Sequence, residues 1–157
     1  MNGNQKIIIY TDGAASGNPG PGGYGAVLMY GRHRKEISKA FRLTTNNRME
    51  LMAVTEALKC LKKPNQIVVV YTDSKYVSEA VNQNWVFEWE KKNFKNKKNP
   101  DLWKAFLCQY RNHQVQLEWV KGHSDNVYNN RCDQLAVEAY KSGIFFIDEA
   151  YESLLEK

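Results

Sequence analysis

The chain has 157 residues, of which 43% are hydrophobic and 25% charged, and its formal net charge at pH 7 is +5. This composition is ordinary for a globular protein, and the length allows one domain with its own hydrophobic core. No apolar run approaches the roughly 18 residues of a membrane-spanning helix, and the first residues lack the pattern of a secretory signal. We therefore expect a single domain over residues 1–157, cytoplasmic and monomeric, with no membrane association and no obligate protein partner.

The cysteines and the charge limit the kinds of function that the chain can have. Cys60, Cys108 and Cys132 are odd in number and far apart, so they form neither a disulfide framework nor a CxxC motif, and we expect buried thiols. The isoelectric point near 9.0 suits a nucleic-acid ligand. Five lysines fall within residues 91–98, where the positive excess is concentrated.

The first part of the chain predicts three strands followed by a helix. Residues 7–10 form an apolar strand, glycines between residues 13 and 23 mark a turn, and further strands are expected at residues 24–30 and 35–43. Strands in such quick succession indicate an antiparallel meander. Apolar residues then recur at helical spacing from Leu51 to Leu61, and Pro64 follows the end of that helix.

The second part predicts a parallel crossover. Residues 66–72 form an apolar strand of the kind that is buried on both faces, and a helix follows to about Val81. A helix opened by Pro100, a strand at residues 115–120 and a last helix at residues 130–141 complete the order. This order predicts an α/β fold in which a mixed sheet carries helices on its faces. Residues 143–157 either extend the last helix or pack on the core, and we assign them no function.

Four acidic residues lie where strands end and helices begin, and each has an ordinary structural explanation. Asp12 follows the first strand and could initiate a turn. Asp73 follows the strand at residues 66–72 and could cap the next helix. Glu50 has capping-box spacing from Asn47. Asp133 falls in the first turn of the last expected helix, where an acid complements the helix dipole.

Taken together, the four acids favour a metal site. Ligands of such sheets bind beyond the carboxyl ends of the strands, so Asp12 and Asp73 should lie close together. Two ionised acids there repel each other, which favours a raised pKa or a bound cation. Ligands that are all oxygens suit Mg²⁺ and disfavour zinc.

Several blocks of the sequence resemble one known family, in the family's order. They are Thr11-Asp12-Gly13, residues 17–25 (GNPGPGGYG), residues 44–50 (TTNNRME), Tyr71-Thr72-Asp73-Ser74, residues 119–123 (WVKGH), Asn129 and Arg131-Cys132-Asp133. These blocks resemble bacterial ribonuclease HI, of the type 1 ribonuclease H family. The resemblance covers residues 6–142 and leaves 143–157 as a C-terminal extension.

The resemblance implies the ribonuclease H fold, a five-stranded mixed sheet with helices on both faces. It implies an endonuclease that hydrolyses the RNA strand of RNA–DNA hybrids without sequence preference and leaves 5′-phosphate and 3′-hydroxyl ends. Two Mg²⁺ ions about 4 Å apart would take part in catalysis, with Mn²⁺ as a substitute. By resemblance, Asp12 bridges both ions, Glu50 and Asp73 lie on the attacking side, and Asp133 lies on the leaving side.

His123 is a further candidate catalytic residue, in a loop after Gly122. A histidine with the unperturbed pKa of about 6.5 can carry protons, and by resemblance this one does so or helps the product leave. A solvated side chain is the alternative. The same loop departs from the commonest family pattern, because Asn130 stands where glutamate is usual and residues 124–128 replace a stretch with glycine and proline. This departure concerns the affinity for the leaving-side ion.

Recognition of a hybrid requires groups that tell RNA from DNA, and the 2′-hydroxyl makes that distinction. Asn18, Asn46 and Asn47 carry amides that both donate and accept hydrogen bonds, so they suit 2′-hydroxyls or base edges. Thr45 suits a phosphate of the DNA strand. Turn and cap roles are the alternative for these residues.

Aromatic residues interleave with the lysines of residues 91–98 and resemble the basic protrusion with which some family members grip the hybrid. Lysines neutralise phosphates, and Trp85, Trp89 and Phe94 could pack against sugars. A solvated lysine-rich face, with Trp85 and Trp89 in helix packing, is the alternative. The predicted substrate-binding residues are Asn18, Thr45, Asn46, Asn47, Trp85, Lys91, Lys92, Lys95, Lys97 and Lys98.

Other functions compete with this interpretation. A non-catalytic hybrid-binding module would need only the basic segment, and the complete set of four acids argues against it. A related metal-dependent DNA nuclease or strand-transfer domain would use similar acids, because fold does not determine substrate. The asparagines and the TTNNRME block favour the hybrid, and the length of the chain disfavours a domain associated with a reverse transcriptase.

Overall fold

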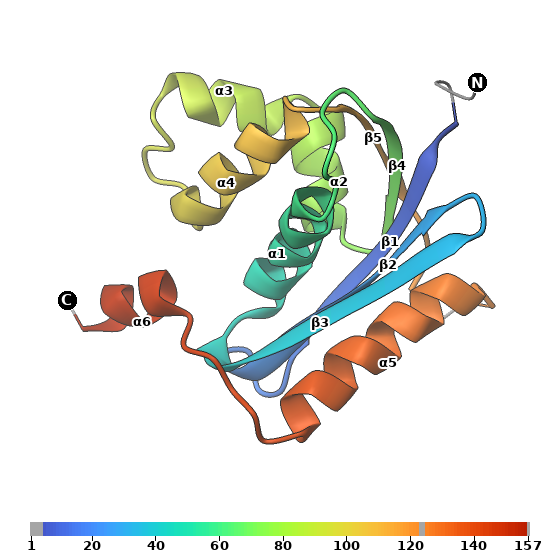
Figure 1. The fold of residues 1–157 in the computed structure, drawn as a ribbon. Helices are drawn as coiled ribbons and strands as arrows, with labels where there is room; N and C mark the ends of the chain where they lie inside the picture. The colour runs from blue at the N-terminus through green and yellow to red at the C-terminus, as the bar shows by residue number, and fades with distance from the viewer. Residues whose placement is uncertain (1–4, 123–124, 157) are drawn as a thin grey trace.

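The computed structural model describes residues 5–122 and 125–156, which form a five-stranded mixed sheet with helices on both sides (Figure 1). The strands lie in the order β3-β2-β1-β4-β5; the first three are antiparallel, and β4 and β5 run parallel to β1. Their bounds are β1 (Ile7–Ala15), β2 (Gly20–Tyr30), β3 (His33–Thr44), β4 (Ile67–Thr72) and β5 (Gln114–Trp119). The predicted mixed sheet is confirmed.

Helices α1 to α4 lie on one side of the sheet and α5 covers the other (Figure 1). The bounds are α1 (Asn46–Lys59), α2 (Lys75–Asn82), α3 (Trp85–Lys91), α4 (Pro100–Tyr110), α5 (Val127–Lys141) and α6 (Glu149–Leu155). Helices α3 and α6 were not predicted, because seven residues each are too few for an apolar repeat to stand out. Within the described part of the chain, no helix is both long and apolar enough to span a bilayer.

The two faces of the sheet carry separate hydrophobic layers, since successive side chains of a strand point to opposite sides. Ile9 and Val70 pack into the larger layer with Leu51 and Trp103. Val27 faces the other way and packs with Cys132 of α5. The central strands are therefore covered on both faces, as their continuous apolar runs predict.

Two expectations about local structure were wrong. The turn after β1 covers only residues 16–19, because β2 already begins at Gly20. Gly23 and Gly25 lie under α5, where a Cβ on Gly25 would come within 2.5 Å of the Cys132 carbonyl oxygen, so these two glycines permit helix packing rather than a turn. Of the cysteines, only Cys132 is buried; Cys60 is half-buried and Cys108 is exposed.

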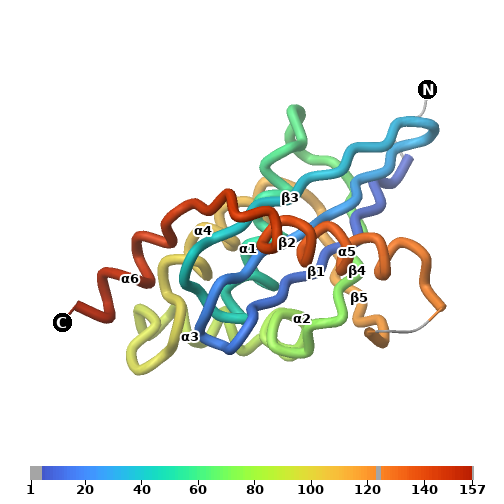
Figure 2. Tube along the Cα trace, turned by 90° about the horizontal axis from the view of Figure 1, so that it is seen from below, coloured from blue at the N-terminus to red at the C-terminus, as the bar shows by residue number. Residues whose placement is uncertain are grey.

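The C-terminal segment packs back on the molecule and does not extend α5. Phe146 forms a parallel bridge with Phe41 of β3, and its amide donates to the Ala40 carbonyl oxygen at 2.9 Å. Figures 1 and 2 show this segment running past the end of β3 to α6. Buried Asp148 ties it to the start of α1, because its carboxylate accepts from the Arg48 guanidinium at 2.7 Å.

Candidate active site

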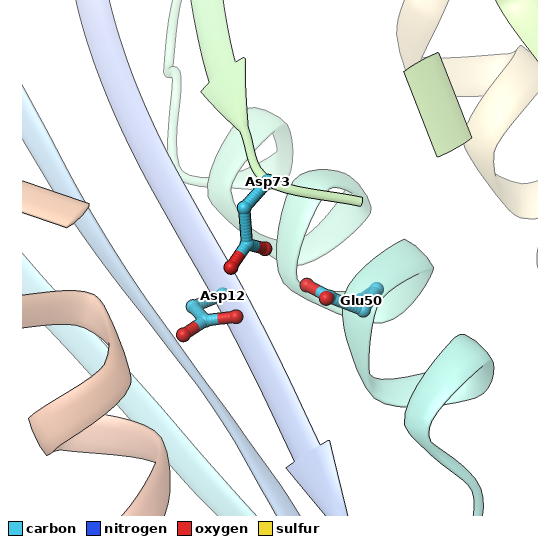
Figure 3. A group of neighbouring side chains, drawn as sticks. All are labelled: Asp12, Glu50 and Asp73. Atoms are coloured by element: carbon cyan, nitrogen blue, oxygen red, sulfur yellow. The ribbon is translucent and has the colours of Figure 1, made fainter. Parts of the chain in front are cut away.

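Asp12, Glu50 and Asp73 converge beyond the carboxyl end of β4 (Figure 3). Each offers a carboxylate oxygen, and these oxygens lie within 4.8 Å of one another. The sheet register explains the first pair. Thr11 of β1 is paired with Thr72 of the parallel strand β4, so the next residue of each segment is an aspartate at the same level.

Glu50 reaches the cluster from α1, which crosses β1 at very short range. A Cβ on Gly13 would lie 2.4 Å from the Met49 carbonyl carbon and 2.5 Å from the Glu50 amide nitrogen. Any side chain at this position would push the helix away, because real Cβ atoms do not approach backbone so closely. The glycine after Asp12 therefore sets the separation between the two carboxylates.

The structure corrects the cap roles that the sequence offered for two of these acids. The N-cap of α1 is Thr45, whose hydroxyl accepts from the Arg48 amide at 3.2 Å, so Asn47 and Glu50 form no capping box. The N-cap of α2 is Ser74, which accepts from the Val77 amide at 3.2 Å, and not Asp73. The hydroxyl side chains of Thr45 and Ser74 take both capping roles, and the carboxylates are left to face each other.

Asp133 is placed differently from the prediction. Helix α5 begins at Val127, capped by Asn126, and Asp133 is its seventh residue rather than a first-turn residue. The explanation through the helix dipole is therefore wrong. Among the described residues, Asp133 is not part of the 4.8 Å group. It is close enough for its negative charge to help raise the pKa of Asp12.

The electrostatics of the cluster favour the neutral carboxyl group of Asp12 and of Glu50 when no cation is bound. Burial, followed by the negative charges of Asp73 and Asp133, raises the pKa of Asp12 to about 8, although the Gly13 amide donates to its Oδ1 at 2.9 Å. Burial, followed by the charges of Asp12 and Asp73, raises the pKa of Glu50 well above its usual value. The neighbouring negative charges thus make ionisation of Asp12 and of Glu50 more costly.

A divalent cation fits this arrangement. Glu50 Oε1 and Asp73 Oδ1 are buried and have no hydrogen-bond partner among the described residues. Buried oxygens normally have partners, and their absence here identifies a place for a ligand that accepts lone pairs. A set of carboxylate oxygens suits a hard cation such as Mg²⁺ or Mn²⁺.

Comparison with known proteins decides the family. The model of the ribonuclease H family (RNase H) matches residues 4–141, which is most of the chain and includes all four acids. The chain belongs to the ribonuclease H family. Members of this family are endoribonucleases, so the chain is an enzyme, as the sequence predicted.

Individual relatives agree with this family assignment. Ribonuclease H of Syntrophomonas wolfei is 54% identical over 143 residues, covering 88% of this chain and 98% of that one. Ribonuclease HI of Synechocystis sp. is 48% identical over 152 residues, covering 93% and 94%.

Solved structures show the same fold. LC9-RNase H1, described as a type 1 RNase H with the type 2 active-site motif, superimposes with a TM-score of 0.81 at 29% identity and covers 98% of this chain and 82% of that one. LC11-RNase H1 in complex with an RNA/DNA hybrid has a TM-score of 0.68 at 28% identity, covering 87% and 98%. The ribonuclease H fold expected from the sequence is confirmed.

The asparagines expected to bind substrate in this ribonuclease H family member have structural roles as well. The side-chain oxygen of Asn46 accepts from the Ala15 amide, and the Asn46 amide donates to Asn18 Oδ1 at 3.0 Å. These two residues therefore join the β1–β2 turn to the start of α1. The alternative roles, turn for Asn18 and Asn46 and cap for Thr45, are thus present in the structure.

The predicted protrusion divides into a packed part and an exposed part. Phe94 is buried, so it cannot contact sugars as expected. Trp89 is half-buried and packs edge-on against buried Trp103, which is the helix packing given as the alternative. Trp85 is 47% exposed and remains available. The five lysines at positions 91, 92, 95, 97 and 98 are exposed, and Lys91 pairs with Glu88 at 3.1 Å.

A groove of about 620 Å³ lies between the start of α1 and the lysine segment. Its wall from α6 could not be found from the sequence, because residues 143–157 carry no motif. The groove is lined by Asn18, Pro19, Thr45, Asn47, Lys97, Lys98, Asn99, Pro100, Tyr151, Leu154 and Leu155.

His123, the further candidate catalytic residue, lies outside the described residues.

Proposed function

We propose that the chain hydrolyses the RNA strand of RNA–DNA hybrids at the cluster of Asp12, Glu50 and Asp73. Cleavage is endonucleolytic and independent of sequence, and it leaves 5′-phosphate and 3′-hydroxyl ends. The observation that carries this proposal is the convergence of three carboxylates on one point, with buried oxygens that lack partners among the described residues. The similar LC11-RNase H1, solved with an RNA/DNA hybrid, supports the choice of substrate.

The proposed cofactor is Mg²⁺, with two ions per active site during catalysis and Mn²⁺ as a substitute. Asp12 would be the shared ligand, Glu50 and Asp73 would serve the attacking side, and Asp133 of α5 would serve the leaving side. When bound, the cations supply positive charge that activates the attacking water and stabilises the departing 3′ oxygen.

The side chains of the cluster prepare this site. The Gly13 amide holds Asp12 Oδ1 at 2.9 Å, so the Asp12 carboxylate keeps its orientation when it loses its proton. The raised pKa values mean that metal binding and proton release are coupled. His123 is proposed as an auxiliary residue that carries a proton or assists product release.

The hybrid is proposed to lie along the groove between the start of α1 and the lysine segment and to reach the cluster from there. Thr45 and Lys97 would contact phosphates of the DNA strand, and Asn47 would contact 2′-hydroxyls or base edges, because all three line the groove. Asn18 also lines the groove, and its side-chain oxygen accepts from the Asn46 backbone amide at 3.0 Å. Lys98 also lines the groove, and the remaining proposed contacts are exposed residues that do not line it: Trp85, Lys91, Lys92 and Lys95.

A cleavage assay with four labelled substrates tests the proposal. The purified protein is incubated with RNA–DNA hybrid, double-stranded RNA, single-stranded RNA and double-stranded DNA, in Mg²⁺ or in EDTA. We expect cleavage of the hybrid alone, and only with Mg²⁺. Asp12→Asn should bind the hybrid as well as the wild type does and cleave it at least about 1000-fold more slowly.

Each rival predicts a different result in this assay. A hybrid-binding module would bind the hybrid and leave it intact, and a DNA nuclease would cut double-stranded DNA. Cleavage retained by Asp12→Asn would remove Asp12 from the mechanism. We also propose that the chain is a single ribonuclease H domain and that it acts as a monomer. Light scattering after gel filtration checks the oligomeric state. The cytoplasmic location stays a prediction.

A further inference from the structure

Asp73 is attached to the residues that follow β5. Trp119, the last residue of β5, is paired with Thr72 of β4, and its indole Nε1–H donates to the Asp73 backbone carbonyl oxygen at 3.0 Å. The next amide, of Val120, donates to the Thr72 carbonyl oxygen at 2.9 Å. Trp119 and Val120 therefore hold Thr72, the last residue of β4, and Asp73, which follows it.

The same segment also approaches the Asp73 carboxylate. A Cβ on Gly122 would lie 2.6 Å from Asp73 Oδ2 and 3.4 Å from its Cγ. The φ angle of Gly122 is outside the left-handed region, so its backbone conformation does not demand glycine. The lack of a side chain is instead required because the backbone lies directly against the carboxylate.

Core packing does not explain Trp119. Its side chain is 45% exposed, and the pairing of β5 with β4 uses backbone groups. The indole has one polar group, a donor, and directs it to the main chain of a candidate metal ligand. Lys75 Nζ lies 5.0 Å from the centre of the ring, a cation–π contact that keeps the indole in this orientation.

We propose that Trp119 and Gly122 are positioning residues for Asp73. Trp119 holds the Asp73 main chain, and the backbone at Gly122 limits the rotation of the carboxylate, which points toward Asp12 and Glu50 (Figure 3). Neither residue belongs to the carboxylate cluster. The inference rests on the proposed role of Asp73 as a metal ligand, and it adds a second layer of residues that orients this ligand.

Calorimetric titration of the substrate-free protein with Mg²⁺ tests the role of Trp119. Trp119→Phe removes the N–H donor and keeps a ring beside Lys75. We expect the Kd for Mg²⁺ to rise about 10-fold, at the low end of the effects seen when such orienting partners are removed. The Mg²⁺ concentration for half-maximal cleavage should rise equally, whereas KM for the hybrid at saturating Mg²⁺ should not change.

Gly122→Ala tests the contact with the carboxylate. The new methyl group must displace Asp73 Oδ2, so we expect Mg²⁺ affinity to fall about 10-fold or more with the urea midpoint nearly unchanged. Gln116→Ala, at an exposed position of the same strand, is the control and should titrate like the wild type.

The outcomes separate this inference from the proposed function. Wild-type Mg²⁺ affinity in both folded variants overturns the positioning role. So does a loss of stability with no change in Mg²⁺ affinity, because that is the result of a merely structural contact. A wild-type protein that neither binds Mg²⁺ nor cuts the hybrid contradicts the proposed function itself.

Discussion

Asp12 lies beside Glu50 and Asp73, and only 5% of its surface is exposed. Burial and the neighbouring negative charges raise its pKa to about 8, so the metal-free carboxyl group is mostly protonated at neutral pH. A pKa that is strongly raised by burial and by neighbouring charges is characteristic of functional sites. The groups at such sites destabilise the folded protein but are reactive.

The stability of the metal-free protein should therefore depend on Asp12 and on pH. The folded protein holds the Asp12 proton up to about pH 8, whereas the unfolded chain loses it near 3.8. The free energy of unfolding consequently falls as pH rises through this interval. Asp12→Asn keeps an acceptor for the Gly13 amide and removes the charge, so its advantage over the wild type should grow from pH 4 to pH 8.

Urea unfolding in EDTA at both pH values measures this effect. At pH 8 we expect Asp12→Asn to be more stable than the wild type by at least about 2 kcal/mol, and at pH 4 the two proteins should differ little. A difference that is the same at both pH values would show that the charge of Asp12 is not its source.

At the scale of elements, Arg48 joins four parts of the chain. It lies in the first turn of α1, is 1% exposed, and donates to Asp148 of the C-terminal segment and to Asp101 of α4. Thr44 at the end of β3 donates to the same Asp148 carboxylate at 2.8 Å. Because Arg48 precedes Glu50 by two residues, this network also supports the part of α1 that carries the site.

Breaking the buried pair should cost far more stability than breaking an exposed one. Asp148→Asn leaves the Arg48 guanidinium without a buried counter-charge, and we expect a loss of about 2–4 kcal/mol. Glu152→Gln is a matched control, because it removes the exposed pair with Arg42 in the same segment and should cost far less stability than Asp148→Asn. Urea unfolding checks both variants, and equal losses would contradict the assigned role of Arg48.

At the scale of the whole molecule, the position of the positive charge matters more than its amount. The net charge is +5, and the lysines of residues 91–98 stand on the protrusion whose end lines the groove. Lys62 and Lys63 are also exposed but precede β4, whereas Asp73 follows it. The chain thus contains a charge-matched pair of lysines at the opposite end of this strand.

Neutralising the two pairs of lysines should have different effects on substrate binding. Lys97→Gln with Lys98→Gln removes phosphate contacts, so KM for the hybrid should rise and the slope of log KM against log salt should fall by up to about 2. Lys62→Gln with Lys63→Gln should leave that slope unchanged. Steady-state cleavage at several salt concentrations measures both, and equal slopes for the two variants would favour a merely solvated lysine face.

Much of the fold could be predicted because it depends on local patterns. The apolar runs at residues 7–10 and 66–72 predicted the central strands β1 and β4, and their parallel pairing placed Asp12 beside Asp73. The helix boundaries were harder to predict from the sequence. Thr45, Asn46 and Asn47 are all good cap residues, and which of them caps α1 depends on how the helix packs on β1.

The sequence by itself determined the order of the strands and of the four longer helices, the family and the acids of the candidate site, because these depend on residue types at short spacings. Only the tertiary structure decided that Asp133 stands apart from the other three acids and that Trp119 holds Asp73. The partners in the Trp119 and Asp148 hydrogen bonds are 46 and 100 residues apart in the chain. No local pattern encodes such pairs, because packing of the whole sheet and its helices brings them together.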